Sequence, residues 1–107
     1  MEIYNLDELA PKVEMPGVQG RVAHAEHLTV SHWHFDAGAD LPSHSHPHEQ
    51  ITYVAEGEIF FCLENEKHHL RAGDLFTVPG NVPHSVQLLS DKVRLVDTFT
   101  PIREDFL

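Results

Sequence analysis

Three histidines and a glutamine stand at spacings that suit a metal site. His44 and His46 are two residues apart, and in an extended chain such residues point to the same face, so both can bind one ion. His84 lies far along the chain, directly after a turn rich in proline and glycine, and is the natural distant ligand. Gln50 shares the parity of the first two histidines and should look into the same interior. The pattern favours a site for one divalent transition metal ion.

The other histidines have simpler interpretations. His48 has the parity of the ligands, and we expect it at the rim of a pocket, where it would contact a substrate rather than the metal. Six further histidines are explained by solvated strand and turn positions: His24, His27, His32, His34, His68 and His69. For any single histidine an ordinary hydrogen-bonded surface or core position is the alternative, so the prediction depends on the joint spacing.

An acidic residue is placed in line with apolar ones near the end of the chain. Val93, Leu95, Asp97 and Phe99 share one face of a predicted strand. Asp97 should therefore point inward, where an unpaired carboxylate is costly. Two roles are open for it. Asp97 is a candidate general acid and base, or it is a carboxylate that orients a ligand histidine.

The elements that must position these residues are short and extended. Brief segments rich in Val, Ile, Thr, Phe and Tyr alternate with turn residues, which is typical of an all-β sandwich or barrel. We expect strands at roughly 19–24, 27–36, 50–56, 58–64, 67–71, 75–78, 84–89 and 92–100. Residues 5–8 predict a short helical turn, because a capping asparagine is followed by acidic residues and Pro11 soon ends the helix. Ile51 and Tyr53 should face outward, which favours burial against a second copy in a homodimer.

The composition excludes several classes of function. At 107 residues the chain is the size of one domain, 1–107. Its formal net charge of -10 should repel nucleic acid, and no apolar run approaches the length of a membrane span. The N-terminus shows no secretory signal and Cys62 is a lone cysteine, so we expect a cytoplasmic protein.

Two segments resemble the paired signatures of the cupin superfamily, Gly-x5-His-x-His-x3-Glu-x6-Gly and Gly-x5-Pro-x-Gly-x2-His. The matching positions are Gly38, His44, His46, Gly57, Gly73, Pro79 and His84. The resemblance implies a jelly-roll β-barrel with one metal ion on His44, His46, Gln50 and His84. Gln50 stands where the signature most often has glutamate, and a neutral amide oxygen there suits manganese, nickel, iron or zinc. Glu49 is the rival ligand, but it would face outward if the strand begins at Gln50.

The chain from about Phe35 to its end is more specifically similar to the small pectin-degradation cupins. Members of that family convert cyclic 4,5-unsaturated uronate monosaccharides to the open-chain keto form, and dimers are usual among them. The resemblance implies that Asp97 does proton chemistry, while Arg103 and Phe99 position an acidic sugar. On sequence alone, the alternative for Arg103 is a surface ion pair with Glu104 or Asp105, or with a neighbouring subunit.

Two other functions are compatible with the same ligands. The first is an iron-dependent cupin dioxygenase, because such ligand sets also activate dioxygen. The second is a protein that binds a metal and a metabolite without turnover. An Asp97→Asn variant separates catalysis from binding, since it should abolish the first and leave the second nearly intact.

Overall fold

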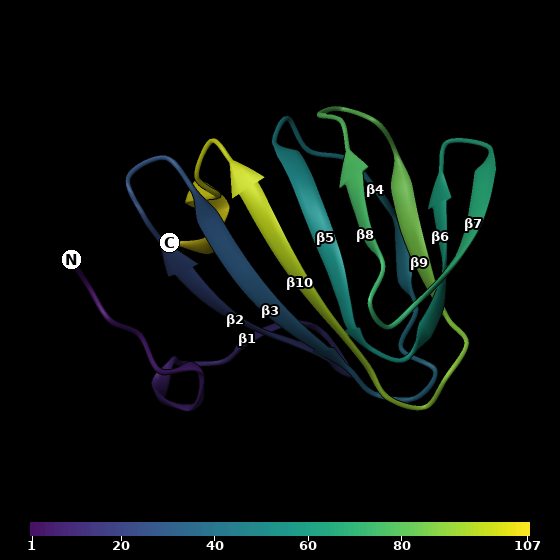
Figure 1. Cartoon of the computed structure of the whole chain (residues 1–107), viewed down its shortest axis with the longest axis horizontal. Helices are drawn as coiled ribbons and strands as arrows, with labels where there is room; N and C mark the ends of the chain where they lie inside the picture. The colour runs from purple at the N-terminus through teal and green to yellow at the C-terminus, as the bar shows by residue number, and fades with distance from the viewer.

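The computed structural model describes residues 1–107, and it is built almost entirely of antiparallel strands (Figure 1). The strands are β1 (Lys12–Met15), β2 (Val18–His24), β3 (Thr29–Phe35), β4 (Leu41–His44), β5 (Glu49–Glu56), β6 (Glu58–Leu63), β7 (Glu66–Arg71), β8 (Leu75–Val78), β9 (His84–Leu88) and β10 (Val93–Thr100). Single turns of 3-10 helix, η1 (Leu6–Glu8) and η2 (Glu104–Phe106), lie near the two ends. Neither is long enough to cross a membrane. The expected all-β architecture with a short N-terminal helical turn is confirmed.

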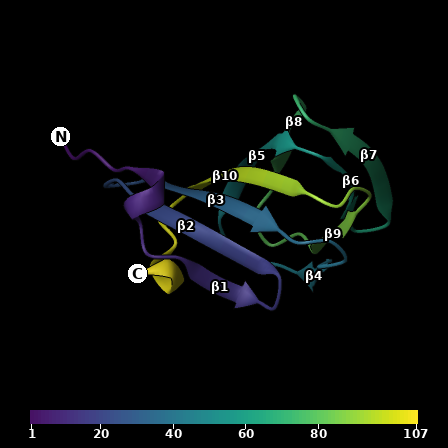
Figure 2. The ribbon, with the colours of Figure 1, turned by 90° about the horizontal axis from the view of Figure 1, so that it is seen from below.

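The strands form two sheets that enclose a common interior (Figure 2). One sheet has six strands in the order β1-β2-β3-β10-β5-β8, and the other has four in the order β4-β9-β6-β7. Apolar side chains from both sheets form the buried core: Val18, Trp33, Phe35, Val54, Ile59, Phe61, Val78, Val86, Val93 and Leu95. Burial of this surface is the main force that holds the sheets face to face.

Two strands follow the predicted alternation and deliver polar groups to the interior. In β5, Gln50, Thr52 and Val54 are buried while Ile51 and Tyr53 are exposed. In β10, Val93, Leu95 and Phe99 are buried on the face that also carries Asp97. The register places Asp97 directly opposite Thr52. The inner faces of two neighbouring strands therefore bring polar residues far apart in sequence to one place.

Three elements were not expected from the sequence. β1 and β4 are edge strands, each paired with a single neighbour, and β4 contains Pro42. Proline is tolerated only at such edges, and it hides the strand pattern from a sequence analysis. The C-terminal turn η2 lies beside β1, with the Lys12 ammonium 5.2 Å from the centre of the Phe106 ring (Figure 2). The predicted strand at 27–36 begins later, at Thr29.

Candidate metal centre

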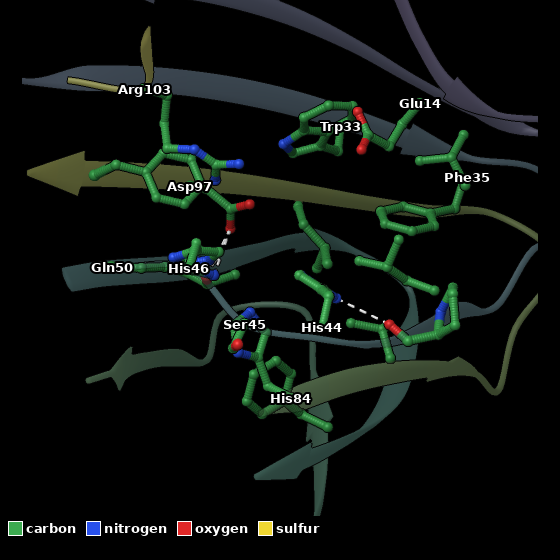
Figure 3. A pocket seen from close by; sticks show the side chains of 18 of the residues that line it. Glu14, Trp33, Phe35, His44, Ser45, His46, Gln50, His84, Asp97 and Arg103 are labelled. Carbon is green, nitrogen blue, oxygen red and sulfur yellow. Dashed lines mark hydrogen bonds between the residues drawn. The ribbon is translucent and has the colours of Figure 1, made fainter. Parts of the chain in front are cut away.

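A cavity of about 450 Å³ lies between the two sheets. Its lining includes His44, His46, Gln50, His84, Thr52, Asp97, Phe99, Arg103, Trp33 and Phe106. Side chains from both sheets and from the C-terminal segment point into it, as Figure 3 shows for the polar groups. Its volume is in the range of pockets that hold a small molecule.

The three histidines of the predicted site meet at this cavity. One ring nitrogen from each of His44, His46 and His84 lies within 4.8 Å of the others. His44 ends β4 and His84 begins β9, and the two are direct partners in the pairing of these strands. His46 follows in the next loop, which is tied to the second motif because the Asn81 N–H donates to the His46 carbonyl at 2.7 Å.

Backbone carbonyls hold each imidazole in the same orientation. His44 Nδ1 lies 2.9 Å from the Pro42 oxygen, His46 Nδ1 3.2 Å from the His48 oxygen, and His84 Nδ1 2.8 Å from the Val82 oxygen. A carbonyl only accepts, so each ring carries its proton on Nδ1 and donates it there. Nε2 of each ring is then free of a proton. This is the tautomer that binds a metal through Nε2, and His84 Nε2 is buried without any hydrogen-bond partner.

The surroundings keep two of the rings neutral. Burial lowers the pKa of His46 to about 4, and the nearby Arg103 guanidinium and the His84 and His44 rings add to this effect. Burial is also the main reason that the pKa of His84 is lowered. A neutral imidazole is the form that binds a metal. Little proton competition is therefore expected from these two rings at neutral pH.

Gln50 lines the same cavity as the three histidines. The side chain is buried, and its Nε2 donates to the Thr52 hydroxyl at 2.8 Å, whereas Oε1 has no hydrogen-bond partner. An orphaned buried carbonyl oxygen is costly unless something else satisfies it. Glu49, the rival ligand, is exposed on the other face of β5. Three Nε2 atoms and one amide oxygen are a donor set that fits a divalent transition metal ion.

Asp97 lies next to this donor set. Its Oδ1 accepts a hydrogen bond from the Thr52 hydroxyl at 2.6 Å. It also accepts a longer one from Gln50 Nε2 at 3.5 Å (Figure 3). Burial raises the pKa of Asp97 to about 6, against the opposing effects of the Thr52 hydrogen bond and the Arg103 charge. No ligand histidine donates a hydrogen bond to Asp97. The hydrogen-bond partners of Asp97 are Gln50 and Thr52, so it does not orient a histidine directly, as was considered from sequence.

Arg103 makes the ion pair that was considered for it, and it also lines the cavity. Its Nε and Nη2 donate to the two carboxylate oxygens of Asp105, at 3.0 and 2.8 Å. The side chain is nevertheless only 11% exposed. Its guanidinium carbon lies 4.7 Å from the centre of the Phe99 ring and 4.1 Å from that of Phe106. Its Nη1 takes no part in the pair with Asp105, and Arg103 is one of the residues that line the cavity.

Of the two other predicted substrate contacts, Phe99 lines the cavity and His48 does not. Phe99 packs edge-on against His46. His48 packs near His46 and Phe99. Sequence analysis did not assign roles to Thr52, which bridges Gln50 and Asp97, or to Phe106, which covers Arg103. The parity of Thr52 with Gln50 was the available signal for the first, and no pattern indicated the second.

The chain has relatives among known proteins. A family model described as a cupin domain matches residues 31–99. The pectin degradation protein KdgF of Dickeya dadantii is 36% identical, with 100% of both chains covered. The 3-hydroxyanthranilate 3,4-dioxygenase of Xenopus laevis is 34% identical over 77% of this chain, which matches 30% of that longer protein.

The fold is also similar to those of solved cupin structures. The structure of KdgF from Halomonas sp. has a TM-score of 0.91 at 34% identity, covering 99% of this chain and 100% of that one. An RmlC-like cupin from Shewanella frigidimarina has a TM-score of 0.90 at 30% identity, covering 100% of this chain and 96% of that one. The expected jelly-roll barrel and the resemblance to the pectin-degradation cupins are thereby confirmed, and the chain belongs to the cupin family.

Proposed function

We propose that this protein converts cyclic 4,5-unsaturated uronate monosaccharides to their linear keto form, as a metal-dependent isomerase in the breakdown of pectin or alginate sugars. The observation that carries the proposal is that one cavity is lined by a carboxyl group with a raised pKa, an arginine and three clustered histidines that could hold a metal ion. Full-length similarity to a pectin degradation protein supports the same substrate class.

The reaction needs one group that moves protons and one that holds an anion. In such a sugar the ring oxygen is bonded to carbon 5 of the 4,5 double bond. Ring opening breaks the bond from this oxygen to the anomeric carbon, and the anomeric hydroxyl loses its proton as the aldehyde forms. The enolate released at carbon 5 becomes a ketone when carbon 4 gains a proton. One proton leaves oxygen and one arrives at carbon, so the reaction is a balanced isomerisation.

The chain supplies groups for each of these tasks. His44, His46, Gln50 and His84 would hold one divalent ion, either manganese, nickel, iron or zinc. When bound, this ion supplies Lewis acidity that polarises an oxygen of the sugar. Three histidines and a neutral amide leave the ion its full positive charge.

Asp97 is the proposed general acid and base. A carboxyl with a pKa of about 6 is ionised often enough to accept the hydroxyl proton and protonated often enough to return one to carbon. Arg103 would bind the uronate carboxylate through the N–H groups that Asp105 does not use. Phe99 would pack against the sugar. His48 would support Phe99 and His46, because its ring packs near both of theirs.

The similarity to a dioxygenase favours a second candidate, an iron-dependent oxygenase built on the same three histidines. That similarity reaches 30% of the relative, whereas the pectin degradation protein is matched along its whole length. A binding protein without turnover is the remaining alternative. Two further proposals concern the whole molecule: it acts as a cytoplasmic single-domain protein, and it forms a homodimer.

The deciding experiment mixes the purified protein with a 4,5-unsaturated uronate monosaccharide and follows the ultraviolet band of the conjugated double bond. We expect rapid loss of the band that is suppressed by a chelator and by Asp97→Asn. The Asp97→Asn protein should retain its metal content, which distinguishes lost catalysis from a lost site. If the metal-loaded wild type does not exceed the uncatalysed rate, the uronate assignment is wrong and the oxygenase or binding alternatives apply.

A further inference from the structure

Thr52 joins the metal site to the proposed proton carrier. Its side chain is 1% exposed, and it follows Gln50 by two residues on the inner face of β5. The same hydroxyl oxygen receives the Gln50 N–H at 2.8 Å and lies 2.6 Å from Asp97 Oδ1. One hydroxyl therefore contacts both groups.

The direction of the two hydrogen bonds is set by what each group can donate. A hydroxyl has one proton and an ionised carboxylate has none, so while Asp97 is ionised the Thr52 hydroxyl donates its proton to Asp97 Oδ1. Only lone pairs of the Thr52 oxygen then face Gln50. Lone pairs attract an N–H and repel a carbonyl oxygen. The amide of Gln50 must accordingly turn its NH₂ group toward Thr52.

This orientation decides which atom of the Gln50 amide is left without a hydrogen-bond partner. With Nε2 held by Thr52 and drawn toward Asp97 Oδ1 at 3.5 Å, Oε1 is the atom left without a partner in the buried interior. The flipped amide would place its oxygen against both Thr52 and Asp97, and would leave an NH₂ group as the unpartnered end of the side chain. An amide NH₂ has no lone pair to offer a metal.

We propose that Thr52 is a positioning residue that makes Gln50 a metal ligand. Its hydroxyl binds the amide nitrogen and so leaves the amide oxygen free for the metal. The inference rests on the metal site of the proposed function. A glutamate at position 50 would not need such a device, since its two oxygens are equivalent. The neutral ligand Gln50 therefore needs a neighbour that fixes the orientation of its amide, and Thr52, two residues further along β5, provides it.

The test measures nickel(II) affinity of the full chain by isothermal titration calorimetry, in a double-mutant cycle of Thr52→Val and Gln50→Ala. Valine keeps the shape of threonine and removes the hydroxyl. We expect Thr52→Val to weaken nickel binding about 10-fold or more, as loss of a group that orients a ligand typically does. Thr52→Ser keeps the hydroxyl and should restore binding close to the wild-type value. In a Gln50→Ala background there is no amide to orient, so Thr52→Val should add no further loss.

Two results would overturn the inference: nickel binding by Thr52→Val at the wild-type affinity, or an equal loss on adding Thr52→Val to Gln50→Ala, which would show a general packing role. If Thr52→Val does not fold, as judged by thermal unfolding of the metal-free protein, Thr52→Ala takes its place in the cycle. A wild type that binds no nickel also overturns it. A wild type that binds nickel but leaves the uronate unchanged overturns the proposed function and leaves this inference standing.

Discussion

Asp97 carries a charge at a position where the fold favours a neutral group. Its pKa is raised from 3.8 to about 6, chiefly by burial. Between these values the folded state binds more protons than the unfolded state. The stability that the protonated form contributes is therefore complete below about pH 4 and is lost as the pH rises through about 6. A shift of this size corresponds to roughly 3 kcal/mol at neutral pH.

An Asp97→Asn variant should accordingly be more stable than the wild type in the metal-free state. We expect a gain of up to about 3 kcal/mol above pH 6 that shrinks toward zero near pH 4, because asparagine resembles the protonated acid. Urea unfolding at a series of pH values measures this difference. Asp91→Asn, at an exposed position, is the matched control and should show no such gain. A gain for Asp97→Asn that does not change with pH would contradict the assigned cause.

Residue parity predicted part of the site and could not predict the rest. The alternation of apolar and polar residues within each strand was sufficient to place Gln50 on β5 and Asp97 on β10 facing inward. The contact of Thr52 with Asp97 depends on the register between β5 and β10, because the two residues are 45 positions apart in the sequence. The sequence also left open whether Arg103 pairs with a neighbour or faces the cavity. In the structure it pairs with Asp105 and also lines the cavity, between the rings of Phe99 and Phe106.

At the scale of elements, the turn before β9 is packed directly against the loop that carries His46. A Cβ added at Gly80 would collide with the Pro47 carbonyl oxygen. Asn81, in the left-handed region with a φ of 65°, donates its N–H to the His46 carbonyl. These contacts connect the two motifs, so the spacing of His46 and His84 depends on them.

A Gly80→Ala variant should disturb this spacing. The turn must shift to admit the methyl group, at a cost of about 1–3 kcal/mol in stability, and we expect weaker nickel binding as well. Gly38→Ala is the matched control, because Gly38 has a φ of 77° and nothing within 4 Å of an added Cβ. It should lower stability through backbone strain alone and leave nickel affinity unchanged. Thermal unfolding and calorimetry measure the two effects, and an unaffected metal site in Gly80→Ala would show that the loop contact does not position His46.

The elements that sequence analysis missed are those with weak internal patterns. β1 and β4 have four residues each, and as edge strands they show no regular alternation of buried and exposed positions. The central strands β5 and β10 are eight residues long and buried on one face, which gives a clear period of two. Pairing with a neighbour, rather than local propensity, therefore determines where β1 and β4 form.

At the scale of the whole molecule, the outer face of the six-stranded sheet differs from the rest of an acidic surface. The chain has a formal net charge of -10, so two copies repel each other in general. On this outer face, however, Tyr53 pairs with Val96 and Leu75, and Ile51 is aligned with Val30 across β10. Ile51 is 48% and Tyr53 41% exposed. This apolar patch within the outer face is where two copies can meet with least repulsion.

A charge introduced into this face should separate the proposed dimer. We expect the wild type to sediment as a dimer and Tyr53→Glu as a monomer, because an acidic group buried at a symmetric contact meets its own copy. Leu89→Glu is the matched control, since Leu89 is also 40% exposed but follows β9 of the other sheet. A monomeric wild type, or a Tyr53→Glu protein that remains dimeric, would contradict the assignment. The residues named here for the metal site come from a single chain, so the monomeric variant should bind nickel as the wild type does.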